Sequence, residues 1–457
     1  MASQEDSPLL ETKKQDYEKK DSKLIEYKNA FSLLLNSETS YFLTIMINFS
    51  TSVQYYILVT LIPLYFTDQH GFSDVEAGAM FGVFGVVIGF SSVYLTHNIH
   101  RISYKRGLYV SFILGCIGFG LVLFDNVWLS IVAILGFQAI SCSITWPYIE
   151  YGIKNYSHNE IRSLSTSIFY MSQYLAGIII GVTIDTLWSI ISDKQNLYFI
   201  ISSFGIFLLI LASFSLYFCR PLSNISEDSP PMSETIKTKK FWRYLLLILI
   251  LILLRSSSFG HLDATLPKYM LRMEGDDAHF GIMLAVHSMN MMVGLLFLTS
   301  LTYYFSNYTL IIVGAAIGSL GSIFLVFIDN MIGYTLFVLF ISTGESIWVP
   351  RVLDYTYAIA PEGHEGVFLA LCNCPFYFGM IVTGATSGLL LYEFCPDDDN
   401  TGECYKVWVY VFFASIAITL VLILLKKVIT GPRGEKDEQV CCLRDKEVEN
   451  EEIQEDY

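Results

Sequence analysis

Long apolar stretches, separated by short polar loops, recur along most of the 457-residue chain. A helix needs about 18 or more apolar residues to cross a hydrocarbon core of about 30 Å. Inside lipid the backbone must satisfy its own hydrogen bonds, so such stretches form helices. The pattern therefore predicts an all-α integral membrane protein with twelve transmembrane helices. They are expected at residues 41–66, 75–97, 107–124, 127–149, 164–187, 197–219, 241–269, 279–300, 308–328, 332–352, 366–392 and 405–427.

The first half of the chain resembles the second at a constant offset of 204 positions. Three separate places agree on this register without gaps, and each lies at an equivalent helix end. The matching residues are Pro63, Tyr65 and Gly71 with Pro267, Tyr269 and Gly275; Leu121, Val122, Asp125 and Asn126 with Leu325, Val326, Asp329 and Asn330; and Glu150 and Tyr151 with Asp354 and Tyr355. Two pseudo-symmetric six-helix bundles are predicted, which is the build of alternating-access transporters.

Polar segments separate these predicted bundles, at residues 41–219 and 241–428, from the rest of the chain. Residues 1–40 are expected to form a cytoplasmic N-terminal tail, residues 220–240 a cytoplasmic linker, and residues 429–457 an acidic cytoplasmic tail. Eight acids and six lysines lie in the first tail, and ten acids and four bases follow residue 430. The net charge of −15 therefore says little about a binding surface.

Composition agrees with a protein that lies in a lipid bilayer. Only 16% of the residues are charged and 53% are hydrophobic, whereas soluble domains carry about 25% charged residues. No basic surface for nucleic acid is expected, and nine cysteines do not make a disulfide-dense secreted scaffold. The charged start has no apolar core of a cleaved signal peptide, so none is expected.

Orientation follows from the lysines and arginines of the short loops. With the N-terminus inside, eleven of them lie in cytoplasmic loops and four on the opposite side, so both termini are predicted to be cytoplasmic. The cytoplasmic set is Arg101, Lys105, Arg106, Lys154, Arg162, Arg220, Lys237, Lys239, Lys240, Arg243 and Arg351; the opposite set is Lys194, Lys268, Arg272 and Lys406.

Two short features of the chain bear on its compartment. Cys395 and Cys404 lie in the last non-cytoplasmic loop, where an oxidising environment favours a disulfide; two free thiols are the alternative. In the N-terminal tail, Glu5 precedes Leu9 and Leu10 in the acidic dileucine pattern read by endosomal sorting adaptors. We therefore favour an endosomal, lysosomal or vacuolar membrane over the plasma membrane.

The twelve helices, the repeat, the linker ending in lysines and the inside termini resemble the major facilitator superfamily over residues 41 to 428. The runs 261–269, 344–351 and 360–366 resemble a little-described eukaryotic branch of that superfamily. The last run, continuing to residue 379, is also similar to the start of the eleventh helix of proton-coupled oligopeptide transporters. This resemblance implies a proton-driven symporter of small peptides or similar solutes.

The sequence also departs from the peptide transporters. Their acidic E-x-x-E-R/K cluster in the first helix is missing, and Asn48, Gln54, Tyr55 and Tyr56 stand in that region. The superfamily pattern between helices two and three survives only as residues 100–106, without its acid.

Ionisable groups inside the predicted spans cost about 2.5–3.5 kcal/mol each on insertion scales, so each is a functional candidate. Arg255 lies about 22 Å along its helix from Lys240, and Glu345 about 9 Å from Arg351. We expect an Arg255–Glu345 pair that a proton or an anionic substrate breaks. A static buried pair that fixes packing is the alternative.

Other polar candidates lie nearer the helix ends. His261 and Asp263, near the non-cytoplasmic end of the seventh helix, suit a proton sensor facing an acidic lumen, or a polar helix end that meets water. Glu150, Arg351 and Asp354 lie at cytoplasmic helix ends, where intrahelical or cross-bundle salt bridges would lock one conformation and gate the path; solvated pairs are the alternative.

Polar and aromatic groups in the spans complete the predicted pathway. Gln54 offers a polar group, and His287 is expected to satisfy a core hydrogen bond. The aromatic residues suit a cavity for an organic solute, although aromatic-rich spans also occur as ordinary packing surface. They are Tyr55, Tyr56, Trp146, Tyr170, Tyr174, Trp348 and Tyr377.

These observations predict a secondary active transporter that moves a small organic solute by alternating access. Proton-coupled symport of a peptide-like or amino-acid-like substrate is the first hypothesis. A facilitative uniporter and a non-transporting sensor on a transporter fold are the alternatives. An enzyme is not expected, since no metal spacing, nucleophile elbow or phosphate loop is found, and no cofactor or metal is expected either.

Overall fold

The computed structural model describes residues 32–35, 37–98, 102–157, 162–222, 237–302, 305–360, 365–396 and 403–431. The sorting pattern of Glu5, Leu9 and Leu10, most of both tails and the middle of the linker lie outside this part of the chain.

The described residues of the first half form six helical spans. Their bounds are α2 (Thr39–Asp68), α3 (Asp74–Asn98), α4 (Tyr104–Val122), a fourth span of α5 (Val127–Ile131), η2 (Val132–Gln138) and α6 (Ala139–Tyr156), then α7 (Arg162–Ile190) and α8 (Lys194–Phe218).

Six further spans form the second half. The first of these consists of α10 (Lys239–Leu254), η4 (Arg255–Phe259), α11 (His261–Ala264) and α12 (Leu266–Glu274), followed by the short η5 (Gly275–Asp277). The others are α13 (Phe280–Leu301), α14 (Asn307–Phe327), α15 (Met331–Ile359), α16 (Glu365–Cys372) with α17 (Cys374–Phe394), and α18 (Tyr405–Thr430). Within the described residues, twelve helices are long and apolar enough to cross a membrane, which confirms the predicted fold class.

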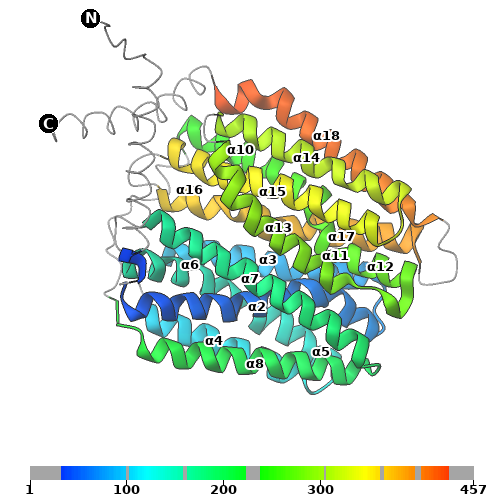
Figure 1. Cartoon of the computed structure of the whole chain (residues 1–457), viewed down its shortest axis with the longest axis horizontal. Helices are drawn as coiled ribbons and strands as arrows, with labels where there is room; N and C mark the ends of the chain where they lie inside the picture. Colours follow the sequence, from blue (N-terminus) through cyan, green and yellow to red (C-terminus); the bar gives the residue numbers. More distant parts are fainter. Residues whose placement is uncertain are drawn as a thin grey trace, which may run out of the picture.

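Figure 1 shows the helices of the two halves as two groups lying side by side. We call α2–α8 the first bundle and α10–α18 the second bundle. We call the face where α2 begins and α18 ends, on the left of Figure 1, the terminal face, and the opposite face the far face. The far face carries the turns between α2 and α3 and between α12 and α13.

The internal repeat has a physical counterpart at the far face. Gly71 and Gly275 both take a positive φ, 65° and 64°, which glycine adopts without the steric cost that other residues meet. Asn126 accepts hydrogen bonds from two backbone N–H groups at the start of α5, and Asn330 does the same at the start of α15. Matching turns and caps therefore sit at equivalent helix ends.

The two bundles touch backbone to backbone near the far face. A Cβ atom on Gly78 in α3 would collide with the carbonyl oxygen of Gly384 in α17. A Cβ atom on Gly181 in α7 would meet the carbonyl oxygen of Gly281 in α13 at 2.5 Å. Glycine at these positions lets helices of opposite bundles approach closely, as small residues do in membranes.

Candidate functional site

The seventh span is interrupted where its charged side chains lie. At Arg255 the α-helix gives way to a π-helical turn, in which the N–H of Gly260 donates to the carbonyl of Arg255 at 2.7 Å. Turns of this kind are frequent at functional sites. From Leu254 to Met270 every residue is buried except Arg255 and Asp263, which keep part of their surface exposed. Both side chains therefore face the same interior space.

Four ionisable side chains meet there, and we call them the charged cluster: Arg255, Asp263, His287 and Glu345. Arg255 Nη2 lies 3.5 Å from Asp263 Oδ2, and its Nε lies 3.9 Å from Glu345 Oε1. His287 Nε2 approaches Glu345 Oε2 at 3.6 Å. The cluster thus joins the seventh span to α13 and α15 of the second bundle.

The charged cluster is held at ion-pair distance but is not tied by good hydrogen bonds. Charge-assisted hydrogen bonds of this type measure about 2.7–2.9 Å. Arg255 Nε, Glu345 Oε2 and His287 Nδ1 are buried and find no hydrogen-bond partner among the residues that the structure describes. The Glu345 side chain is only 5% exposed, and the other three are 12–15% exposed. Buried polar atoms without partners cost about 1–3 kcal/mol each, so the cluster is built to receive another polar group.

Tyrosines of the first bundle face this cluster. Between Ser50 and Phe66 of α2, only Tyr55 and Tyr56 keep part of their surface exposed. Tyr55 interacts electrostatically with Arg255 and Asp263, and Tyr56 with Asp263 and Glu345. Tyr174 of α7 interacts with Glu345 and Arg255. The candidate site therefore lies where the two bundles meet.

Aromatic rings surround the remaining sides of the site. The ring of Phe376 lies 5.9 Å from the guanidinium carbon of Arg255. Trp348 stacks on Phe376 at 6.2 Å with an interplanar angle of 14°, and Trp146 packs edge-on against Tyr55 at 5.9 Å. Trp348 itself is almost fully buried, at 1% exposure, so it supports the site from behind Phe376.

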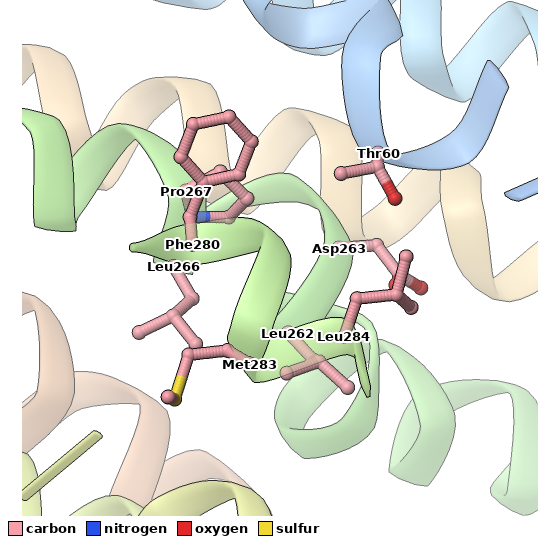
Figure 2. A pocket seen from close by; sticks show the side chains of 8 residues that line it. All are labelled: Thr60, Leu262, Asp263, Leu266, Pro267, Phe280, Met283 and Leu284. Carbon is pink, nitrogen blue, oxygen red and sulfur yellow. The ribbon is translucent and has the colours of Figure 1, made fainter. Parts of the chain in front are cut away.

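A narrow pocket extends from Asp263 toward the far face. Figure 2 shows its polar side chains, Thr60 of α2 and Asp263, on one side together with Leu284 of α13, and further apolar side chains of α12 and α13 across from them. The apolar lining includes Leu266, Pro267 and Met283. Asp263 therefore stands between the charged cluster and the contact that closes the far face.

Two predicted pathway residues lie in other contacts. His261 Nδ1 is 2.6 Å from Thr265 Oγ1, which donates to Ser387 of α17 at 2.8 Å. Gln54 donates to Gln138 Oε1 at 2.5 Å, and Gln138 donates to the carbonyl of Gly115. His261 and Gln54 are each only 1% exposed. The structure thus places His261 in the packing of the seventh span on α17, and Gln54 in the packing of the first bundle.

The predicted gating residues Glu150, Arg351 and Asp354 lie at the terminal face. Arg351 pairs with Asp354 on the same helix at 2.8 Å and donates to Thr302 at the end of α13 at 3.0 Å. Glu150 is exposed on α6.

Charged and polar side chains join the two bundles at the far face. Asp74 of α3 pairs with Lys268 at 3.0 Å. Both of its carboxylate oxygens also accept a hydrogen bond from Arg272 Nη2 at 2.8 Å. Asp185 of α7 pairs with His279 at 2.8 Å. We call these five residues the far-face gate.

Sequence reasoning missed this gate, because Lys268 and Arg272 count only as loop charges in the orientation argument. Their spacing of four residues, which places both on one helix face, is the signal that was available. Close by, Cys395 and Cys404 form a disulfide, and Arg272 donates to the carbonyl of Cys395. The gate therefore also touches the last loop.

The sequence model of the Major Facilitator Superfamily matches residues 44–384. The chain belongs to this superfamily. The predicted superfamily is thereby confirmed, together with a multi-pass membrane protein of the transporter type. No curated protein sequence matches the chain. In the described ranges, no group of three or more His, Cys, Asp and Glu residues is arranged to hold a metal ion.

Solved transporters share the fold. A structure of a proton dependent oligopeptide transporter matches with a TM-score of 0.71 and 13% identity, over 87% of this chain and 99% of that one. A POT family transporter in complex with a thioalcohol conjugated peptide matches at 0.68 and 13%, over 86% and 96%. A mutant of the nucleoside transporter NupG matches at 0.67 and 14%, over 85% and 100%. At this identity the likeness concerns the fold alone.

Proposed function

We propose that this major facilitator protein is a secondary active transporter that moves a small organic solute by proton-coupled symport, with a peptide-like or amino-acid-like substrate. The observation that carries the proposal is the charged cluster where the two bundles meet. In this cluster Glu345 lies beside Arg255, and each of the two side chains has a buried polar atom without a hydrogen-bond partner in the described part of the chain. Alternating access exposes a site in this position to each side in turn.

Coupling follows from competition for Arg255. An ionised Glu345 attracts the guanidinium, whereas a protonated Glu345 leaves it available for an anionic group of the solute. The titratable and charged groups that face Glu345 are Arg255 and Asp263 of the seventh span, His287 of α13, Tyr56 of α2 and Tyr174 of α7. The solute binds well only after the proton does, so the two cross together.

The orientation and location belong to the same proposal. We place the terminal face in the cytoplasm, with both termini, because the lysines and arginines of the loops gather there. The Cys395–Cys404 disulfide at the far face supports this, since disulfides persist on the oxidising side of a membrane. An endosomal, lysosomal or vacuolar membrane, reached through sorting adaptors, is the proposed location.

Flux across a sealed bilayer tests the function. Purified protein is reconstituted in liposomes that hold a pH-sensitive dye, with an inward proton gradient. Dipeptides, amino acids, sugars and nucleosides are added as separate pools. We expect one pool to drive acidification of the lumen, and Glu345→Gln to abolish it.

The exposed Glu393 of α17 supplies the matched control. Glu393→Gln should retain the acidification. Solute uptake without proton movement would replace symport by facilitated uniport, and a response that survives Glu345→Gln would move the proton site to Asp263 or His261. No response to any pool would sink the transport proposal and leave a sensor on a transporter fold.

A further inference from the structure

The charged cluster carries an unbalanced charge, and this restricts what binds there. With His287 neutral, it holds one guanidinium and two carboxylates, so its net charge is −1. A net charge in the membrane interior is costly. The proton of the proposed symport, placed on Glu345, removes the imbalance. A solute that accompanies the proton keeps the cluster neutral only if its own net charge is zero.

The remaining Arg255–Asp263 pair favours a solute that is charged at two points. Once Glu345 is protonated, Arg255 and Asp263 stand 3.5 Å apart, too far for the hydrogen bond that such a pair forms. Each side chain keeps part of its surface exposed, 15% for Arg255 and 14% for Asp263. A solute with a carboxylate and an ammonium group would give each a partner, whereas an uncharged solute would leave both poorly paired.

The short separation also limits the distance between the solute's charges. Groups that bind to Arg255 and Asp263 at hydrogen-bond distance must lie next to each other. In an α-amino acid, both charged groups are attached to one carbon. Each further residue of an extended peptide adds about 3.3–3.6 Å between its termini. The two termini of a peptide therefore cannot occupy the pair together without folding back.

From this charge balance and spacing we infer that the substrate is a free α-amino acid, held with its carboxylate on Arg255 and its ammonium on Asp263. The inference rests on the proposed proton-coupled function, because the neutral balance includes the proton on Glu345. The rings of Tyr55, Tyr56 and Phe376 border the pair. They offer the ammonium a cation–π face and the side chain an apolar wall.

Ligand-induced thermal stabilisation of the full-length protein in detergent tests this inference without requiring transport. The probes are the twenty free α-amino acids, tested singly. Each one that raises the unfolding temperature is then compared with its N-acetyl derivative, its amide and its dipeptide. We expect the three derivatives to bind about ten- to a hundredfold more weakly, since each removes or displaces a charged hydrogen-bond partner.

Two variants assign the ammonium contact. In Asp263→Asn, the affinity ratio between a free amino acid and its N-acetyl derivative should fall toward one. Asp193→Asn changes an exposed helix cap of the first bundle and should keep the full ratio. Because the ratio is measured within each variant, partial loss of folded protein does not mimic the result.

The outcomes separate the two proposals. Equal or tighter binding of dipeptides, equal binding of N-acetyl derivatives, or no stabilisation by any amino acid would overturn the inference. Acidification driven by dipeptides in the liposome assay would overturn it while leaving symport intact. Binding and uptake of free amino acids without proton movement would keep the amino-acid site and refute the proton coupling.

Discussion

At the scale of single residues, the two histidines of this region differ in what surrounds them. His287 lies beside Glu345 and keeps a buried ring nitrogen without a partner. His261, although it stands two positions from Asp263, is occupied by Thr265 and almost fully buried. Chemical type and position along the chain therefore do not separate a site residue from a packing residue; the contacts do.

Gln54 provides the prediction at this scale. Gln54→Leu removes the donor to Gln138 and leaves the buried Oε1 of that side chain unpaired. We expect a loss of about 1–3 kcal/mol in the free energy of unfolding, with an unchanged KM for the transported solute. Thermal unfolding in detergent and uptake kinetics measure the two effects.

Thr183 of α7, which is partly exposed, serves as a control, since its hydroxyl donates to the carbonyl of Ile179 in its own helix. Thr183→Val should change stability by less than about 0.5 kcal/mol. A raised KM in Gln54→Leu, with normal stability, would instead place Gln54 on the substrate path.

At the scale of helices, the seventh span connects the site to the gate. Its π-helical turn begins at Arg255, its α-helix is interrupted again at Thr265, and its last segment, α12, carries Lys268 and Arg272 to Asp74. Charged side chains of the site and of the gate are therefore placed by consecutive segments of one interrupted span.

The gate yields an asymmetric prediction. Asp74→Asn leaves two buried cations, Lys268 and Arg272, without their carboxylate, and losing one partner of a buried ion pair costs about 3–5 kcal/mol. Lys268→Met removes one of the two cations and leaves Asp74 paired with Arg272. We expect Asp74→Asn to open the far face and Lys268→Met to have little effect.

A cysteine in place of Thr60, which lines the pocket below the gate, reports the opening. A membrane-impermeant maleimide, applied from the far face, should label this cysteine at least about tenfold more in the chain that also carries Asp74→Asn than in the chain that keeps Asp74. Labelling of the chain that keeps Thr60 is subtracted as background. Glu76→Gln, an exposed acid on the same helix that bonds to Ser73, is the matched control. Unchanged labelling in Asp74→Asn would show that the glycine contacts alone keep this face closed.

At the scale of the whole molecule, the bundles meet along α3 with α17 and α7 with α13, and their ion pairs lie at the far face. The arrangement is that of a state closed on this face. The disulfide lies at the same face, close to Arg272.

The disulfide permits a test of orientation. In sealed vesicles, a membrane-impermeant reductant should reduce Cys395–Cys404 only when applied to the side opposite the C-terminal tail, whose position proteolysis reports. Alkylation of the freed thiols with a large maleimide gives a mobility shift on a gel. Reduction from the side of the tail would reverse the placement of the bridge relative to the termini.

Much of the architecture was predictable, because it depends on local properties of the chain. Each span can be recognised from the length of its own apolar stretch. Matching turns, such as those at Gly71 and Gly275, place the two halves of the chain in register. The Arg255–Glu345 pair was also predicted, because an arginine in the membrane interior needs a partner and Glu345 is an acid within a span of the same half. Sequence alone therefore determined the fold, the superfamily and one pair of the site.

Only the tertiary structure decided which other polar groups meet. Asp263 faces Arg255 after a π-helical turn that hydrophobic periodicity does not reveal. His287 reaches Glu345, and Asp74 reaches Lys268, through the rotation and contact of helices that are far apart in the chain. Such contacts depend on how helices pack and on which face of the molecule is closed. A local pattern of apolar and polar residues records neither.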